Sequence, residues 1–397
     1  MKVEPGERSW APWGALSLVF ALVWGGCADA ARRGVERYDA DQLEASLEQP
    51  DELGLEMGVF PLKQGAIVDG DTIKVGGLEE SLRLIGLDTE ETFKSEKNKR
   101  EYEEGWAVYW AKKSEGHSRP IKIATPMGEE AKHFAQDFFK GVRRVKLERD
   151  HPKEIRGRYN RFLAYVFAER DGKWVNYNVE AVRAGMTPYF TKYAYSRRFH
   201  EDFVEAQEEA RAAKRGIWSD AEGHYPDYPR RLEWWNARAD FIAEFEREAR
   251  GHSDMVVLTH FDAPQRLEAL LDREVEVLAT VGDIKPREGK APARVMLSRR
   301  LFADMPLIFW DEEVLAQSGI EAYKGEFVRV KGLVTAYTNK YTGKTVLQIE
   351  VRMPRQVRLP PYSPPGLEAS GQAPEAEVAP PVEPADVAET NLQPDDA

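Results

Sequence analysis

The chain has 397 residues, enough for two or three domains that each bury a core of their own. Hydrophobic residues make up 42% of it and charged residues 31%, which excludes both a wholly disordered chain and a multispanning membrane protein. The formal net charge of −12 excludes a generally basic protein, so any nucleic-acid binding must come from a local basic surface.

The first 30 residues have the pattern of an export signal. A basic start precedes a short apolar run at 13–24, which is shorter than the about 20 apolar residues that a membrane-spanning helix needs. Gly25-Gly26-Cys27 resembles the bacterial lipobox, whose cysteine is lipidated, while Ala28-Asp29-Ala30 offers a competing cleavage site. Cys27 is the sole cysteine, which excludes internal disulfides. We expect an exported protein, either a lipoprotein anchored through Cys27 and facing the cell exterior or periplasm, or a secreted one.

Changes of pattern divide the rest of the chain. Apolar residues at helical spacing predict helices at 196–215 and 230–250, and alternating residues predict strands at 274–281, 327–334 and 346–351. Pro, Ala and Glu dominate the end of the chain, a composition that does not form a packed core. The predicted order is an export signal (1–30), a polar tether (31–56), a mixed first domain (57–220) with an insertion (93–127), a helical linker (221–262), a strand-rich second domain (263–360) and a disordered acidic tail (361–397).

Two acidic segments flank predicted strands in the first domain. Asp69 and Asp71 lie two residues apart, so both side chains point to one face of an extended chain. Asp88 and Glu91 follow an apolar strand. If the intervening hairpin folds back, Asp71, Asp88 and the Thr89 carbonyl converge as hard oxygen ligands, which suit calcium and offer nothing to zinc or copper. Each acid taken alone is more simply a solvated turn residue.

Two arginines complete the set of groups that a phosphodiester needs. Arg83 precedes Asp88 by five residues, and Arg161 lies far downstream in the segment 157–166. A metal cation and guanidinium groups neutralise the charge that grows in a five-coordinate phosphorus transition state, while a free carboxylate activates water. These residue types together favour a phosphodiesterase.

In their order along the chain, these motifs closely resemble those of the staphylococcal nuclease family. The family pattern Asp-Gly-Asp-Thr, then Arg, then Asp-Thr-Pro-Glu is met at 69–72, 83 and 88–91, and later family elements are met at 159–164, 175–176 and 216–219. The resemblance covers residues 65–219. It implies an OB-fold, calcium-dependent endonuclease that hydrolyses DNA and RNA at the bond to the 5′ oxygen and leaves a 3′-phosphate.

The resemblance also implies residue roles. It implies a calcium site from Asp71, Asp88 and the Thr89 backbone with Asp69 close by, Glu91 as the general base, Arg83 and Arg161 on the scissile phosphate, and Tyr189 or Tyr193 against a base or phosphate. Two positions depart from the family. Glu90 replaces a proline, which adds negative charge beside Glu91. Asn160 replaces a glycine before Arg161, and asparagine tolerates a left-handed turn.

The insertion is rich in aromatic residues. Tyr102, Trp106, Tyr109 and Trp110 fall on one helical face, and two lysines follow. A flap that stacks bases and holds phosphates is one interpretation. A small helix that packs its aromatic residues on the domain is the favoured one, since aromatic side chains dominate cores.

The second domain resembles nucleic-acid-binding OB-fold modules. The predicted fold class is therefore a mixture of β-barrels and helices: an OB-fold nuclease domain, a helical linker and a second OB-like barrel. Lys340, Tyr341 and Lys344 form a candidate substrate-binding edge on a predicted hairpin, and a scaffold barrel with ordinary surface lysines is an equal alternative. Seven histidines are scattered without metal-ligand spacing, which predicts structural or surface roles.

Three functions remain open, and the third, a structural surface lipoprotein, would explain the export signal and the acidic tail. The leading hypothesis is an exported calcium-dependent endonuclease, with DNA and RNA as substrates and no obligate protein partner. The alternative is a non-catalytic nucleic-acid-binding surface protein that uses the nuclease-like and OB-like modules. The alternative leaves the acids and arginines of the first domain unused.

Overall fold

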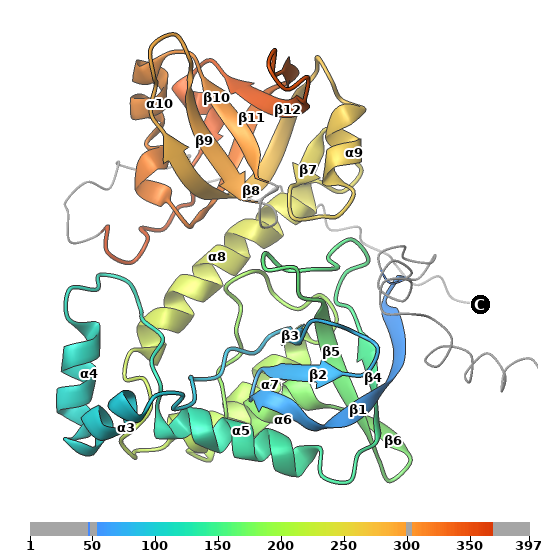
Figure 1. Cartoon of the computed structure of the whole chain (residues 1–397), viewed down its shortest axis with the longest axis vertical. Helices are drawn as coiled ribbons and strands as arrows, with labels where there is room; N and C mark the ends of the chain where they lie inside the picture. Colours follow the sequence, from blue (N-terminus) through green and yellow to red (C-terminus); the bar gives the residue numbers. More distant parts are fainter. Residues whose placement is uncertain (1–46, 48–53, 299–303, 368–397) are drawn as a thin grey trace, which may run out of the picture.

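Two β-barrels joined by a long helix make up the described part of the chain (Figure 1). The computed structural model describes residue 47 and residues 54–298 and 304–367. The export signal with Cys27, most of the tether and most of the acidic tail lie outside these residues, so what the sequence predicts for them stays a prediction. None of the described helices has the length and apolarity to cross a membrane.

The first barrel is a closed five-stranded sheet. Its strands lie in the order β1-β2-β3-β5-β4, and β4 returns to pair with β1. The contact between β3 and β5 is parallel, and the other pairings are antiparallel. A further strand, β6, extends the sheet beyond β5. The bounds are β1 Glu56–Asp69, β2 Thr72–Val75, β3 Leu82–Leu84, β4 Arg144–Glu148, β5 Leu163–Arg170 and β6 Lys173–Asn176.

Helices cover this barrel and close its apolar core. Thr125 accepts a hydrogen bond from the Gly128 N–H at the start of α5, and Pro126 occupies its first turn, where a missing N–H costs nothing. Ile73, Leu84 and Val145 are fully buried inside the barrel. The helices are α3 Glu96–Glu103, α4 Trp106–Ser114, α5 Pro126–Phe138, α6 Tyr177–Arg183 and α7 His200–Ala212, with a short 3-10 turn η1 at Gly216–Trp218.

The second barrel has the same connectivity as the first. Its strands follow the order β8-β9-β10-β12-β11, β11 closes on β8, and the contact between β10 and β12 is again parallel. The helix α10 lies between the third and fourth strands, as α5 does in the first barrel. The bounds are β7 Met255–Val257, α9 Ala263–Glu268, β8 Glu274–Lys285, β9 Ala293–Ser298, β10 Met305–Phe309, α10 Glu312–Ser318, η2 Ile320–Tyr323, β11 Phe327–Thr338, β12 Thr345–Val351, η3 Pro354–Gln356 and β13 Val357–Arg358. The predicted fold class of two barrels with helices is confirmed.

The helix α8, Tyr228–Glu248, binds both barrels. Arg238 on α8 forms a fully buried ion pair with Glu326, which directly precedes β11. Trp234 Nε1 and the hydroxyl of Tyr362 donate to the same carboxylate at 3.2 and 3.1 Å. Because Glu326 is wholly buried and held by several donors, the second barrel is fixed to α8 at this point.

The insertion forms two helices, α3 and α4, which are separated at Gly105 with a φ of 123°. The expected single aromatic face is therefore wrong, because Tyr102 lies on α3 and the other three aromatic residues lie on α4. All four still pack together, and Tyr109 is fully buried and donates to the Ala124 carbonyl at 2.9 Å. The packing interpretation of these residues is confirmed.

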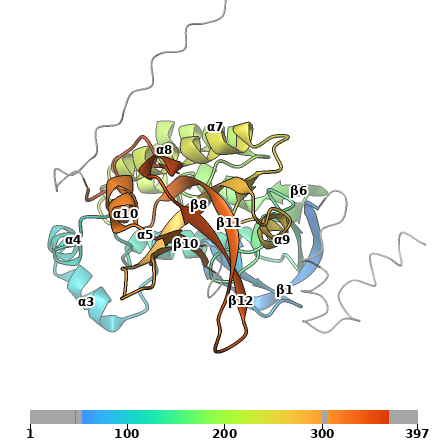
Figure 2. The ribbon, with the colours of Figure 1, turned by 90° about the horizontal axis from the view of Figure 1, so that it is seen from above.

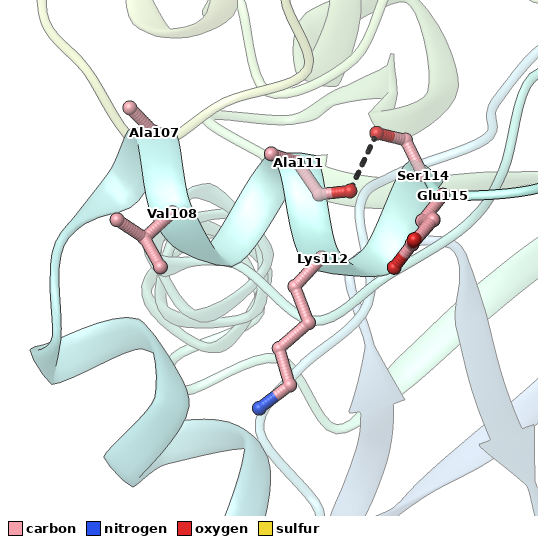
Figure 3. A pocket seen from close by; sticks show the side chains of 6 residues that line it. All are labelled: Ala107, Val108, Ala111, Lys112, Ser114 and Glu115. Carbon is pink, nitrogen blue, oxygen red and sulfur yellow. Dashed lines mark hydrogen bonds between the residues drawn. The ribbon is translucent and has the colours of Figure 1, made fainter.

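The other face of α4 is exposed. Figure 3 shows a shallow pocket there, with Val108 and Lys112 on one side and the Ser114 hydroxyl donating to the Ala111 carbonyl. Its lining is mostly apolar, and the hydroxyl is already bonded to its own helix. We assign this pocket no role in the chemistry.

Candidate active site

The turn that joins β1 to β2 carries the first pair of acids. A side chain on Gly70 would lie 2.8 Å from the Thr89 methyl group and 2.9 Å from the Ala131 side chain, so glycine is required for this close approach. The hydroxyl of Tyr177 donates to the Gly70 carbonyl at 2.6 Å. The turn is therefore held against Thr89 and α5, which fixes where Asp71 points.

Arg83 joins the two acidic segments. Its Nη1 lies 2.6 Å from Asp71 Oδ2, and its Nη2 lies 2.6 Å from Asp88 Oδ1. Burial would lower the pKa of the guanidinium, but the two carboxylates outweigh it and raise that pKa. The structure thus brings together three of the predicted site residues: Asp71 from the β1–β2 turn, Arg83 from β3 and Asp88 from the loop after β3.

Asp88 has a second cationic partner, Lys122 from the insertion, whose Nζ lies 2.5 Å from Asp88 Oδ1. The backbone N–H of Asp88 donates to the buried Thr187 hydroxyl at 3.2 Å. Burial would raise the pKa of Asp88, but Lys122 and Arg83 outweigh it, so the pKa lies below its usual value. Asp88 is therefore ionised, and it is positioned from both sides.

Lys94 links the remaining two acids. Its Nζ lies 3.1 Å from Asp69 Oδ2 and 3.3 Å from Glu91 Oε2. Asp69 also accepts a hydrogen bond of 2.8 Å from the Thr92 hydroxyl. The Glu91 side chain is 40% exposed, and its backbone carbonyl accepts from the Thr125 N–H at 3.0 Å. Glu91 therefore presents a carboxylate to solvent from a fixed backbone.

Glu90 points away from the other acids, which corrects the expectation that it adds charge beside Glu91. Its carboxylate is buried and accepts from the Tyr225 N–H at 2.7 Å, the Tyr228 hydroxyl at 2.8 Å and the Thr125 hydroxyl at 2.5 Å. Burial raises its pKa despite these donors. Glu90 fastens the acidic segment to the insertion and to the start of α8.

Arg161 lies just before β5. Leu163 of β5 pairs with Arg83 of β3, and Arg161 precedes Leu163 by two residues. Alternate residues of an extended chain point to the same face, so this register predicts that Arg161 lies on the face of Arg83. Asn160 adopts a left-handed conformation with a φ of 63°, as predicted. The half-buried Arg161 side chain forms no ion pair with any described carboxylate, which leaves it available to an anion.

The two nominated tyrosines differ in environment. Tyr189 is 3% exposed, stacks on Phe203 at 4.7 Å and accepts from the Ser196 N–H, so it is a core residue that cannot stack on a base. The prediction for Tyr189 is wrong because its ring completes the barrel core. Tyr193 is 59% exposed and follows Lys192. Burial and the nearby Arg238 lower the pKa of Lys192 to about 8.

The second barrel presents the predicted hairpin to solvent. The β11–β12 hairpin projects beyond the barrel body (Figure 2). Tyr341 at its tip is 86% exposed, and Lys340 Nζ lies 4.9 Å from the centre of the Tyr341 ring. Lys344 is exposed on the same hairpin. The structure therefore groups these three residues apart from the acids of the first barrel.

The donor chemistry fits a hard cation. Asp71, Asp88 and the Thr89 carbonyl offer oxygen atoms alone, and no described histidine contacts them. Among the residues that the structure describes, Asp71 Oδ1 accepts only from a neutral hydroxyl, that of Thr72, at 2.8 Å. Sequence reasoning missed Lys122, Lys94 and Lys192 around these acids. No local motif marks the three lysines, since their roles depend on how the insertion and the segment after α6 fold back.

Comparison with known proteins agrees with this geometry. A family model described as "Staphylococcal nuclease homologue" matches residues 81–220. An uncharacterised protein of Methanocaldococcus jannaschii is 30% identical over 158 residues, which cover 38% of this chain and 69% of that protein. The thermonuclease of Staphylococcus hyicus is 30% identical over 158 residues (38% and 72%), and that of Staphylococcus intermedius is 28% identical over 154 residues (38% and 72%).

Proposed function

Because the chain belongs to the family of staphylococcal nuclease homologues, we propose that it is a calcium-dependent endonuclease acting on DNA and RNA. The observation that carries the proposal is the bridge from Arg83 to both Asp71 and Asp88. It brings together the carboxylate of the β1–β2 turn, the guanidinium of β3 and the carboxylate of the loop that follows β3. A non-catalytic binding protein would need none of this arrangement.

Different residues of the chain would activate the water and bind the phosphodiester. Glu91, exposed to solvent, accepts a proton from the attacking water. Arg83 and Arg161 hold the scissile phosphate and neutralise its growing charge, and the pairing of Arg83 with Leu163, two residues after Arg161, supports this assignment. Lys94 pairs with both Glu91 and Asp69 and so holds the two carboxylates near each other. The bond to the 5′ oxygen breaks, and a 3′-phosphate remains.

Calcium would be held by Asp71, Asp88 and the Thr89 carbonyl, with Asp69 nearby. When bound, it supplies positive charge to the phosphate oxygens. Arg83 then has two tasks, since it orients both carboxylates and faces the substrate. The buried Thr187 hydroxyl keeps the Asp88 backbone in place.

The substrate strand would contact two exposed aromatic residues. Tyr193 lies beside the partly buried Lys192 in the first barrel, and Tyr341 lies with Lys340 and Lys344 on the second. Aromatic faces stack on bases of any sequence, and neighbouring cations hold the backbone. This combination suits a nuclease with little sequence preference.

Export is part of the proposal and rests on the sequence of residues 1–30 alone. A lipid on Cys27 would anchor the enzyme to a membrane, and cleavage near Ala30 would release it. Mass spectrometry of the mature N-terminus distinguishes the two. A Cys27→Ser variant should move from the membrane fraction to the medium or periplasm if the cysteine is lipidated.

Plasmid and RNA degradation by the purified chain tests the activity. We expect cleavage with calcium and none in excess chelator. Arg161→Gln should lose most of the activity while a matched Arg158→Gln, three residues away, retains it. Full activity in chelator would contradict the calcium assignment, and absence of cleavage under both conditions would support the binding protein instead.

A further inference from the structure

A second cluster of ionisable side chains lies where the first barrel meets α8, and it contains none of the residues assigned to catalysis. Glu154 comes from the connection between β4 and β5, Glu246 from the last turn of α8, and His260 from the segment between β7 and α9. One ligand atom from each lies within 4.8 Å of the others. Three distant parts of the chain therefore converge here.

His260 has no hydrogen-bond partner among the described residues, although its side chain is only 9% exposed. Its Nε2 lies 3.8 Å from Glu154 Oε1, which is too far for a hydrogen bond. Its ring stacks on that of His151, with centroids 4.7 Å apart. A buried imidazole with both nitrogens unbonded is costly, and an ion or an ordered water is the usual partner of such a group. Burial lowers the pKa of His260 to about 4, so at neutral pH it is uncharged, the form that binds metals.

The charges around His260 do not balance. The facing carboxylates are Asp150, Glu154, Glu246 and Asp262, and the facing cations are Arg197 and Lys153. Four carboxylates against two cations leave a formal excess of −2 before the imidazoles are counted. A divalent cation would neutralise this partly buried excess.

We propose that Glu154, Glu246 and His260 bind a divalent transition-metal ion of the Zn²⁺ class. One imidazole nitrogen with two carboxylates is a donor set that zinc accepts, whereas calcium prefers oxygen alone. Arg197 bonds to both carboxylates, and each carboxylate oxygen keeps a second lone pair for the ion. Arg197 thus orients the ligands from outside, as outer partners do in metal sites. The ion would link the first barrel to α8 and to the segment between β7 and α9, which leads into the second barrel.

Metal titration of the full chain tests the site. After dialysis against chelator, Co²⁺ binding is followed by visible absorption, and Zn²⁺ binding by calorimetry and by the shift in Tm. We expect the His260→Gln variant to bind Zn²⁺ at least about 10–100-fold more weakly and to lose the Tm increase. The matched control is His252→Gln, an exposed histidine that should bind like the wild type.

Two further variants test the site if His260→Gln does not fold or if the metal binds elsewhere. Glu246→Gln removes a half-buried ligand and replaces His260→Gln if that variant does not fold. Asp71→Asn reports binding at the candidate active site instead. The proposal is overturned if the wild type binds no Zn²⁺, if the His260 and Glu246 variants bind as tightly as the wild type, or if Asp71→Asn alone removes the Co²⁺ spectrum.

Discussion

Lys122 Nζ lies 2.5 Å from Asp88 Oδ1, so the insertion places a cation on a carboxylate that is proposed to bind calcium. The same carboxylate oxygen also accepts from Arg83. Arg83 and Lys122 thus neutralise the Asp88 carboxylate when no metal is bound. Calcium must therefore compete with Lys122 for the Asp88 carboxylate.

Lys122→Gln should bind calcium more tightly than the wild type. Lys122 is 45% exposed, so solvent screens the ion pair and its loss should change affinity by up to about 1 kcal/mol, or about fivefold. Calorimetric titration with Ca²⁺ measures the change, and the exposed Lys97→Gln serves as the control. Weaker calcium binding by Lys122→Gln would mean that Lys122 supports the metal site.

Glu91→Gln should lower the cleavage rate by about 10²–10⁴-fold, the usual contribution of a general base. Nucleic-acid binding should be nearly unchanged, since the amide keeps the shape of the side chain. Single-turnover cleavage and equilibrium DNA binding, measured separately, test this. Glu130→Gln, an exposed acid on α5, controls for the loss of charge. A loss below tenfold would remove Glu91 as the base.

Glu90 should make stability depend on pH. Burial raises its folded-state pKa above the ordinary 4.5, so the stability that it contributes is full below that value and is lost as pH rises through the raised pKa. Glu90→Gln keeps the acceptor without the charge, so its unfolding free energy relative to the wild type should rise over this range. Denaturant unfolding from pH 4 upward measures it. A constant difference between the two proteins would contradict the burial argument.

Breaking the buried pair of Glu326 and Arg238 should destabilise the chain strongly. Glu326→Ala leaves a guanidinium buried without its partner, at a cost of about 3–5 kcal/mol. The exposed pair of Lys324 and Asp283 is the matched control, and Lys324→Ala should leave the free energy of unfolding nearly unchanged. Denaturant unfolding of both variants compares them. Equal losses would show that Glu326 does not hold the second barrel to α8.

Tyr341→Ala should weaken binding to single-stranded DNA by about 1–3 kcal/mol, or about 5–150-fold, if the hairpin stacks bases. Lys344→Gln should reduce the salt dependence of binding by about one phosphate contact. Trp174→Ala, which removes an exposed aromatic residue from the first barrel, is the control. Wild-type affinity in Tyr341→Ala would make the second barrel a scaffold.

Where strand pairing and alternation determine the position of a side chain, that position could be predicted from the sequence. Asp71, Asp88 and Arg83 lie beside short strands of one hairpin, so their convergence needed only the right pairing. Tyr189 could not be placed in this way, because exposure depends on α7, which brings Phe203 against it. The sequence between α6 and α7 contains no periodic pattern that distinguishes Tyr189 from Tyr193.

The converging side chains at the second cluster could not be predicted either. Glu154, Glu246 and His260 come from three elements, and no spacing along the chain relates them. The histidines were therefore expected to be structural or exposed. The imidazole meets the two carboxylates because α8 and the segment between β7 and α9 both pack against the β4–β5 connection.

The contacts of Glu90 determine where an expressed fragment of the chain can end. Similarity to the family ends at residue 220, yet two of the three donors to this carboxylate, Tyr225 and Tyr228, lie past that point. An expressed fragment that ends at residue 220 would leave the buried Glu90 carboxylate without two of its three hydrogen-bond donors. A soluble catalytic fragment should consequently extend through the opening turns of α8.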